Sequence, residues 1–352
     1  MNLSIEWLNG SVAALDIEAQ KNAQARQASL TKPPGALGRL ENLAIQLSAL
    51  QGIARPCVDN VYIAVFAADH GVVKEGVSAF PQEVTAEMVK NFSHGGAAIS
   101  VSAREINAVM EVINLGMIND PGVLKGVINN PLGAGTENLS VQAAMSEDQL
   151  AAALDAGGKA VERAFSNGAQ LFIGGEMGIG NTTAATALTC ILLDESPEKL
   201  TGPGTGLSVE GVSHKVQIIQ RAIKLHENHI DSPLEALRRV GGFEIAALAA
   251  AYISCAQRGL PVLIDGFISS SAALVAEKIC PGIKDWLLFS HCSAEPGHRR
   301  MLEALEAKAL LDLQMRLGEG SGAAIAVPLL RMACALHNDM ATFAEAQVSE
   351  KM

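Results

Sequence analysis

Five short apolar runs along the 352-residue chain predict the buried strands of a parallel sheet. Each run is apolar at nearly every position and is followed by a glycine or a polar turn, whereas a half-exposed strand would alternate apolar and polar residues. The runs span residues 61–68, 109–115, 170–174, 261–265 and 286–290.

Alanine-rich stretches with helical spacing lie between these runs, at residues 97–104, 148–167, 183–193, 243–258 and 270–279. The alternation of strands and helices predicts an α/β fold in which a Rossmann-like parallel sheet is flanked by helices. Ligands of such sheets bind at the carboxyl ends of the strands.

The two ends of the chain differ from its centre because they contain no predicted strand. Amphipathic helices are expected at residues 16–30, 37–51, 299–315 and 324–337. We therefore expect a small helical domain built from both chain ends, residues 1–55 and 300–352. The α/β domain, residues 56–299, then carries most of the site.

Composition and charge narrow the class of protein. The chain is 49% hydrophobic and only 4% aromatic, which suits a tightly packed, helix-rich α/β enzyme. A net charge of −11 argues against nucleic acid as a partner, because phosphate binding needs clustered Lys and Arg. Six widely spaced cysteines without a C-x-x-C pair, no signal peptide and no membrane-spanning stretch predict a soluble cytoplasmic protein.

Polar residues follow the predicted strands and are candidates for one common site. They are the segments Asp69-His70-Gly71, Gly174-Gly175-Glu176, Asp265-Gly266 and His291-Cys292-Ser293. His70 and His291 are expected to shape the pocket by hydrogen bonding.

Two glutamates stand out because glycines surround them. Glu319 lies in the segment LGEGSGAA and Glu176 in GGEMGIGNTT. An exposed loop residue is the ordinary interpretation of either glutamate alone. The apolar flanks of Glu319 favour burial instead, and a buried carboxylate with a raised pKa is a better general base.

Two segments are candidates for phosphate binding. Gly202-Pro203-Gly204, followed by Lys215, could direct backbone N–H groups and one positive charge at an anion. Asn181, Thr182 and Thr183 open a predicted helix, where they could cap it, bind phosphate or do both. An ordinary loop remains an alternative for the first segment, since a Walker A sequence is absent.

Metal and serine-nucleophile chemistry receive little support. His226 and His229 are three positions apart, but no third ligand has a recognisable spacing. A nucleophile elbow, G-x-S-x-G, would need serine where Gly320 stands. No metal and no cofactor are expected.

Six ordered motifs resemble one family, that of nicotinate-nucleotide:dimethylbenzimidazole phosphoribosyltransferase. The similarity extends from about residue 30 to residue 340, and its motifs are KPPGALGRLE (32–41), ADHGV (68–72), GGEMGIGNTT (174–183), VGGFE (240–244), PVLIDGF (261–267) and RLGEGSGAA (316–324). The resemblance implies a homodimeric enzyme that moves 5-phosphoribose from nicotinate mononucleotide to 5,6-dimethylbenzimidazole with inversion. Nicotinate and α-ribazole 5′-phosphate, for the lower ligand of cobalamin, would be the products.

The resemblance also implies roles for individual residues. It places the catalytic base at Glu319 and a second pocket carboxylate at Glu176. It places phosphate and ribose contacts near Gly178, Asn181, Thr182, Gly204, Lys215, Asp265 and Ser293. It places the pocket for the acceptor base around Phe80, Pro81, Met88, Met177 and Leu317.

Two other classes of function stay open at this point. An NAD-dependent dehydrogenase would need G-x-G-x-x-G after the first strand and an acidic residue about 20 positions on, which the chain lacks. A non-catalytic nucleotide-binding or azole-binding module would bind both ligands without forming product.

Overall fold

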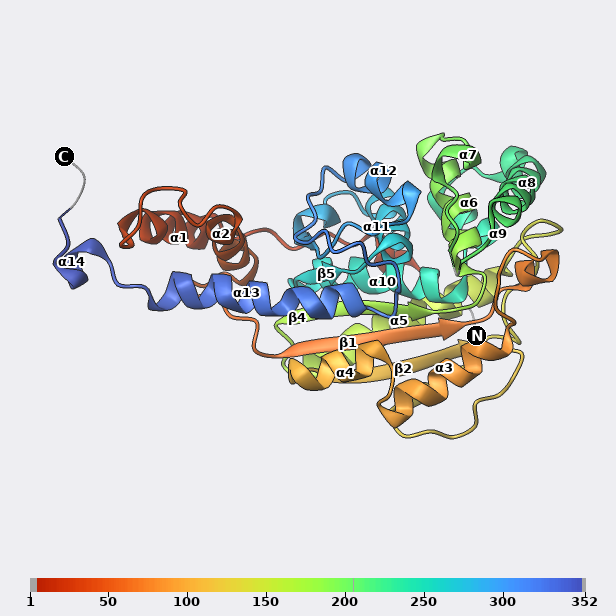
Figure 1. Cartoon of the computed structure of the whole chain (residues 1–352), viewed down its shortest axis with the longest axis horizontal. Helices are drawn as coiled ribbons and strands as arrows, with labels where there is room; N and C mark the ends of the chain where they lie inside the picture. The colour runs from red at the N-terminus through yellow and green to blue at the C-terminus, as the bar shows by residue number, and fades with distance from the viewer. Residues whose placement is uncertain (1–4, 205, 350–352) are drawn as a thin grey trace.

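The chain forms a six-stranded parallel sheet with helices on both faces, which confirms the predicted fold class. A computed structural model describes residues 5–204 and 206–349, and Figure 1 shows their arrangement. The spatial order of the strands is β3-β2-β1-β4-β5-β6. Their bounds are β1 Val61–Ala68, β2 Val109–Gly116, β3 Val127–Asn129, β4 Leu171–Met177, β5 Val262–Ile264 and β6 Leu287–Phe289.

This strand order contains one topological switch point, between β1 and β4. From β1 the chain first adds β2 and β3 on one side, and later adds β4, β5 and β6 on the other. A crevice opens at such a point, outside the carboxyl ends of the strands, because neighbouring connections leave in opposite directions. This rule favours a crevice beside β1 and β4, and the cavity described below lies on the β4 side of the switch point, at the carboxyl ends of β4 and β5.

The described residues contain fourteen α-helices. Helices α3 and α4 cover one face together with part of α13, and α5, α10 and α11 cover the other (Figure 1). The bounds are α1 Ile17–Ser29, α2 Arg39–Gln51, α3 Glu83–His94, α4 Ala98–Glu105, α5 Glu147–Ser166, α6 Asn181–Leu193, α7 Pro197–Leu200, α8 Val209–His226, α9 Pro233–Val240, α10 Phe243–Arg258, α11 Phe267–Ile279, α12 Pro296–Ala304, α13 Ser321–Asp339 and α14 Phe343–Ala346.

One predicted helix, residues 299–315, is wrong beyond its first turns. Helix α12 ends at Ala304, and the segment that follows pairs with the edge of the sheet. Leu310 N–H donates to Phe289 O at 2.9 Å and Leu311 N–H donates to Ser290 O at 2.9 Å. These tertiary hydrogen bonds replace the helical ones, so helical spacing of apolar residues is not sufficient here.

Strand β3 was not predicted because a strand of three residues is too short to show a periodic pattern.

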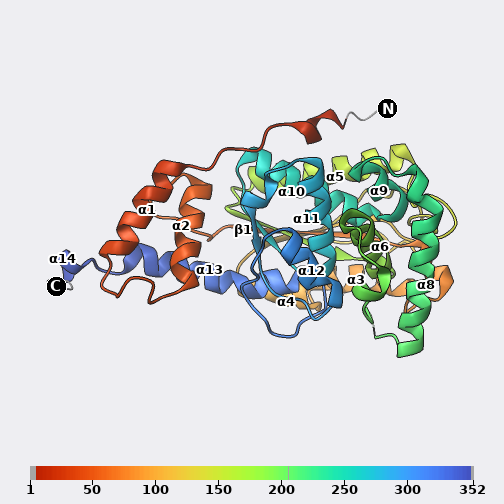
Figure 2. The same cartoon turned by 90° about the horizontal axis from the view of Figure 1, so that it is seen from above.

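The helices of the two chain ends lie together at one end of the molecule (Figures 1 and 2). Helix α2 packs on α13, and the Arg26 guanidinium donates to His337 O and Asn338 O, both at 2.7 Å. The first described residues lie elsewhere, because Gln257 of α10 donates to Trp7 O at 2.9 Å. The domain boundaries stay a prediction.

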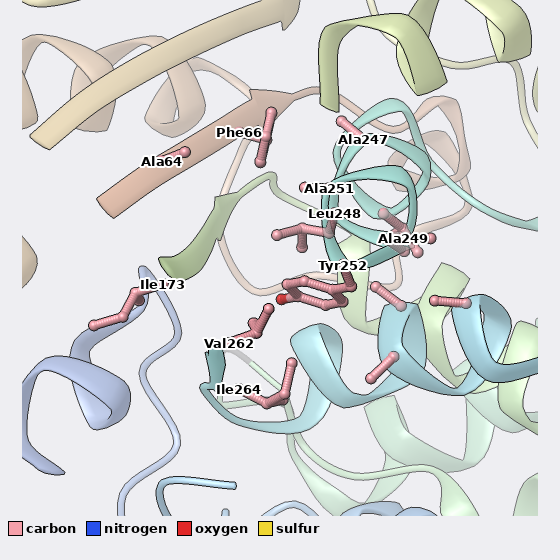
Figure 3. Packing of buried hydrophobic residues seen from close by; sticks show 14 of the residues in the cluster. Ala64, Phe66, Ile173, Ala247, Leu248, Ala249, Ala251, Tyr252, Val262 and Ile264 are labelled. Carbon is pink, nitrogen blue, oxygen red and sulfur yellow. The ribbon is translucent and has the colours of Figure 1, made fainter. Parts of the chain in front are cut away.

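Helix α10 forms the centre of the hydrophobic core. Every residue from Phe243 to Ala256 is buried, and Figure 3 shows Leu248 and Tyr252 between the side chains of β1 and β5. Gly174 of β4 makes this packing possible, since a Cβ there would lie 2.5 Å from Leu248 Cδ2. Small residues thus bring the helix close to the sheet.

Two adjacent glycines in α5 provide a matched test of this packing. A Cβ on Gly157 would lie 2.1 Å from Ala247 O, whereas a Cβ on Gly158 would make an ordinary 3.5 Å contact with Trp7. We expect Gly157→Ala to lower the free energy of unfolding by about 1–3 kcal/mol through overpacking. We expect Gly158→Ala to raise it by about 0.5–1 kcal/mol, because alanine is the better helix former. Thermal midpoints of the two variants test both signs, and equal shifts would contradict the proposed helix contact.

Candidate active site

A cavity of about 410 Å³ lies at the carboxyl ends of β4 and β5, beside α3, α6 and the loop that precedes α13. It contains most of the residues expected in the site: Phe80, Met88, Glu176, Met177, Gly178, Asn181, Thr182, Gly204, Asp265, Ser293, Leu317 and Glu319. Two expected residues, Pro81 and Lys215, are not part of the lining. The fold thus brings together segments that are far apart in the sequence, while the chemical role of each residue stays a prediction.

Glu319 has an unusual backbone. Its φ is +66°, and the flanking Gly318 and Gly320 have φ values of +92° and +90°. Glycine adopts this left-handed region without a steric penalty, whereas a residue with a Cβ is disfavoured there. Strain of this kind is retained where the surrounding structure holds the residue, and it is often found at functional sites.

The Glu319 carboxylate is buried at the N-terminus of α4, with 5% of the residue exposed. The Ile99 N–H donates to Glu319 Oε2 at 3.1 Å, so an otherwise unpaired helix N–H holds the side chain. Burial raises the pKa of Glu319, and the nearby Asp265 raises it further, while the Ile99 N–H opposes the shift. The carboxylate is thus fixed in position and more basic than a solvated one.

Asp265 anchors the loop that carries Glu319. Its Oδ2 accepts the Gly320 N–H at 3.2 Å and its Oδ1 accepts the Ala323 N–H at 2.9 Å. These donors belong to the N-terminal turn of α13, so Asp265 caps that helix from the end of β5. Burial raises the pKa of Asp265, and His291, whose Nε2 is 3.7 Å from Oδ1, opposes the shift.

Glu176 is the second buried glutamate of the cavity. It lies in β4, and the Asn181 Nδ2–H donates to its Oε2. Burial, together with the charges of Asp265, Glu244 and Glu319, raises the pKa of Glu176 well above its ordinary value. Two neighbouring carboxyl groups therefore differ in proton affinity, an arrangement that separates an acid from a base.

The candidate phosphate end of the cavity contains Thr182 at the start of α6 and Gly204. Lys215 lies behind this lining, where its Nζ donates to Thr182 Oγ1 at 2.7 Å. Lys215 is 1% exposed, and burial lowers its pKa to about 8, while Glu295 opposes the shift. Any direct contact between Lys215 and a ligand would therefore require a small rearrangement at Thr182 or Gly204.

Apolar side chains form another part of the cavity lining. Phe80 and Met88 come from α3 and the segment before it, and Leu317 comes from the Glu319 loop. Phe80 and Leu317 are 49% and 61% exposed, so the mouth of the cavity presents apolar surface to solvent.

Two charged residues of the cavity, Glu295 and Arg316, were not predicted as site residues from the sequence. Arg316 Nη1–H donates to Gly204 O at 3.2 Å and so ties the Glu319 loop to the glycine-rich segment. Glu295 lies two positions after the segment His291-Cys292-Ser293, and Arg316 is the first residue of the motif RLGEGSGAA. This closeness to recognised segments was the available signal. His291 lines the cavity as expected, whereas His70 is buried outside the lining, where its Nε2 lies 2.6 Å from Glu244 Oε1.

The histidine pair considered as a metal site has a different role in the fold. His226 Nε2–H donates to Leu139 O at 2.9 Å. Within residues 5–204 and 206–349, no group of three or more His, Cys, Asp or Glu is arranged to hold a metal ion. No helix in that part of the chain is long and apolar enough to cross a membrane.

Comparisons with known proteins agree with this geometry. A family model described as phosphoribosyltransferase matches residues 12–348. The nicotinate-nucleotide--dimethylbenzimidazole phosphoribosyltransferase of Xanthomonas campestris pv. campestris (strain B100) is 58% identical over 99% of this chain and 100% of its own length. Its namesake from Pseudomonas putida (strain GB-1) is 59% identical over 98% of each chain. The crystal structure of a namesake from Thermus thermophilus has a TM-score of 0.91 and 45% identity, covering 96% of this chain and 100% of that one.

The fold, the cavity and these matches define the protein as an enzyme of the phosphoribosyltransferase class. Within that class, the chain belongs to the nicotinate-nucleotide–dimethylbenzimidazole phosphoribosyltransferase family, as its motifs indicate.

Lys215 gives a prediction about stability. Its pKa falls from 10.5 to about 8 on folding, so the unfolded chain binds more protons than the folded one between these values. The stability of the wild type should therefore rise with pH through this window. Lys215→Met removes the titrating group, so the stability of wild type relative to this variant should increase by about 2 kcal/mol from pH 7.5 to 9.5.

Chemical denaturation of both proteins at the two pH values measures this change. Lys224→Met is the matched control, since Lys224 lies on the same helix but is not buried. A difference that does not change with pH for Lys215→Met would show that the lysine keeps its ordinary pKa in the fold.

Proposed function

We propose that the protein transfers 5-phosphoribose from nicotinate mononucleotide to 5,6-dimethylbenzimidazole. The products are nicotinate and α-ribazole 5′-phosphate, a precursor of the lower ligand of cobalamin. The observation that carries the proposal is the pair of buried carboxyl groups, Glu319 and Glu176, in a cavity lined by both apolar and polar residues. The names of the relatives support the same substrates.

The chemistry requires one bond to break, one to form and one proton to leave. The bond from C1′ to the pyridinium nitrogen breaks, and its electron pair returns to the ring nitrogen. A lone pair on one benzimidazole nitrogen attacks C1′ from the opposite face, so the configuration inverts from β to α. The other benzimidazole nitrogen then carries an acidic proton, which Glu319 accepts as the general base.

Glu176 would act in its protonated form. Because burial and the neighbouring acidic charges raise its pKa well above the ordinary value, it can donate a hydrogen bond where Glu319 accepts one. Nicotinate leaves as a neutral pyridine, so the departing ring nitrogen needs no positive charge beside it.

The polar end of the cavity would hold the donor. Its phosphate would lie near Gly178, Asn181, Thr182 and Gly204, at the N-terminus of α6, with Lys215 behind Thr182 as a source of positive charge. Asp265 and Ser293 would lie beside the ribose. The acceptor ring would lie among Phe80, Met88, Met177 and Leu317.

We further propose that the enzyme is a homodimer that works in the reducing cytoplasm. The exposed apolar side chains of Phe80 and Leu317 at the cavity mouth favour burial against a second copy. All six cysteines are free thiols, as a reducing compartment permits. Light scattering coupled to size-exclusion chromatography tests the dimer, and a monomer at micromolar concentration would contradict it.

Glu319→Gln tests the assignment of the base. The amide keeps the shape of the side chain and removes only the proton acceptor, so turnover should fall by about 10²-fold or more while donor binding is retained. In the wild type, kcat/KM should fall on the acid side, as Glu319 becomes protonated, and the midpoint should lie above the ordinary glutamate value of 4.5. Turnover of the variant within a few-fold of wild type would falsify the assignment.

The acceptor preference tests the apolar end of the cavity. Each methyl group buried among Phe80, Met88 and Leu317 should add roughly 0.8 kcal/mol, or about fourfold in preference. Adenine would leave its exocyclic amine without a partner there, at a cost of about 1–3 kcal/mol. In competition for limiting donor, 5,6-dimethylbenzimidazole should therefore exceed benzimidazole modestly and adenine strongly.

Mass spectrometry of the products measures these ratios, and Leu317→Ala should reduce the advantage of the methylated ring. A product mixture dominated by the adenine nucleotide would show that a different base is the natural acceptor.

A further inference from the structure

Glu295 places a carboxylate at the polar end of the cavity, where the proposed function expects an anionic ligand. It lines the cavity and is 6% exposed. Its Oε2 lies against the Cα of Gly202, so that a Cβ there would be only 1.9 Å away. No role for Glu295 follows from the reaction as proposed above.

The side chain of Glu295 does not serve its own helix. Glu295 is the N-cap residue of α12, a position where a carboxylate usually accepts a backbone N–H. Its side chain makes no such bond and extends to residues 202–204 instead. The favourable interactions of the carboxylate are with the charges of Lys215 and Arg316 and with the Gly204 N–H.

These partners form an anion cradle, which we define as residues 202–204 with Lys215 and Arg316. Arg316 and Lys215 both lie close to Gly204. Arg316 donates to Gly204 O at 3.2 Å, and a Cβ on Gly204 would lie 3.3 Å from Lys215 Nζ. In the proposed function the donor phosphate lies near Gly204 with Lys215 behind the lining, so it would compete for the same positive charge and the same backbone N–H. A phosphate carries a charge of about −1.5 to −2 near neutral pH, so it and an ionised Glu295 repel each other in one cradle.

We propose that Glu295 is an internal anion that occupies the cradle of the empty enzyme and gives it up to the phosphate monoester of the donor. This inference rests on the proposed function. When the phosphate binds, Glu295 takes up a proton from solvent, which removes the repulsion between the two anions. The carboxylate thereby keeps Lys215 charged before the ligand arrives, and it makes binding selective for a phosphate dianion over neutral or singly charged ligands.

The groups that face Glu295 come from three elements. Lys215 approaches from α8 and Arg316 from the loop before α13, and both favour its ionised form, as does the Gly204 N–H. Burial opposes ionisation and raises the pKa of Glu295. Burial and the charge of an arriving phosphate both favour the protonated carboxyl group, so phosphate binding and proton uptake by Glu295 are coupled.

Glu295→Gln tests the inference, with Glu303→Gln as the matched control. Both changes remove one negative charge from the same region, but Glu303 is on the outer face of α12, where its side chain is 69% exposed. Isothermal titration with inorganic phosphate and with nicotinate mononucleotide should show binding about tenfold tighter for Glu295→Gln, because a like-charge contact is lost. Glu303→Gln should bind as the wild type does.

Proton uptake gives a second measurement that a purely structural role would not change. Titrations in buffers of different ionisation enthalpy should show uptake on phosphate binding by the wild type and less uptake by Glu295→Gln. Glu295→Asp keeps the charge on a shorter side chain and should retain the proton uptake. It allows the same measurement if Glu295→Gln does not fold.

The outcomes separate the inference from the proposed function. Weaker or unchanged phosphate binding by Glu295→Gln would overturn the inference, since the carboxylate would then only support the cradle. Tighter phosphate binding by the variant, with no ribazole phosphate formed by the wild type, would leave the internal anion standing and refute the proposed transfer.

Discussion

The site depends on one close contact between two backbones. A Cβ on Gly175 of β4 would lie 2.1 Å from the carbonyl oxygen of Glu319, so the strand and the loop touch without an intervening side chain. Gly318 is constrained from the other side, because a Cβ there would lie 2.3 Å from Glu176 Oε1. Glycine at both positions lets the two glutamates enter one cavity from segments more than a hundred residues apart. The backbone is left-handed at residues 318–320, and glycine on both sides of Glu319 lowers the steric cost of that turn.

Four buried carboxylates share the cavity, and their surroundings give them different properties. Asp265 accepts backbone N–H groups and anchors the base loop, while Glu319 accepts one N–H and faces the cavity. Glu176 lies where burial and the charges of three other acids together raise its pKa well above the ordinary value. Glu295, by contrast, lies close to the positive charges of a lysine and an arginine. In the proposed function the same functional group would serve as anchor, base, acid and internal anion, according to what surrounds it.

The sequence predicted the sheet well because buried parallel strands leave a clear pattern, and the run at residues 61–68 coincides with β1, whose eight residues are all buried. Residues 305–315 misled the prediction because their apolar spacing fits a helix, yet their N–H groups bond to the edge at β6. Local periodicity cannot reveal a partner that is distant in sequence. The candidate site shows the same limit. Motifs that resemble a known family supplied most of its residues. They did not predict that Lys215 lies behind Thr182, or that Glu295 lines the cavity. Those facts depend on how α6, α8 and α12 pack against one another, and no segment contains that information by itself.

The charges of the proposed donor explain why the protein can keep charged side chains buried in this cavity, although burying them costs free energy. Lys215 is buried with its pKa lowered to about 8, and Glu319 is buried with its pKa raised, so each favours a partner of opposite sign. Nicotinate mononucleotide carries both partners, a phosphate for the lysine and a pyridinium for the carboxylates. In the proposed reaction the pyridinium loses its charge at the same step in which the acceptor ring becomes cationic, and Glu319 then takes the proton. Positive charge thus passes from the donor ring to the acceptor ring and is neutralised at Glu319, so the carboxylates are used throughout the transfer and the phosphate charge at the other end stays unchanged.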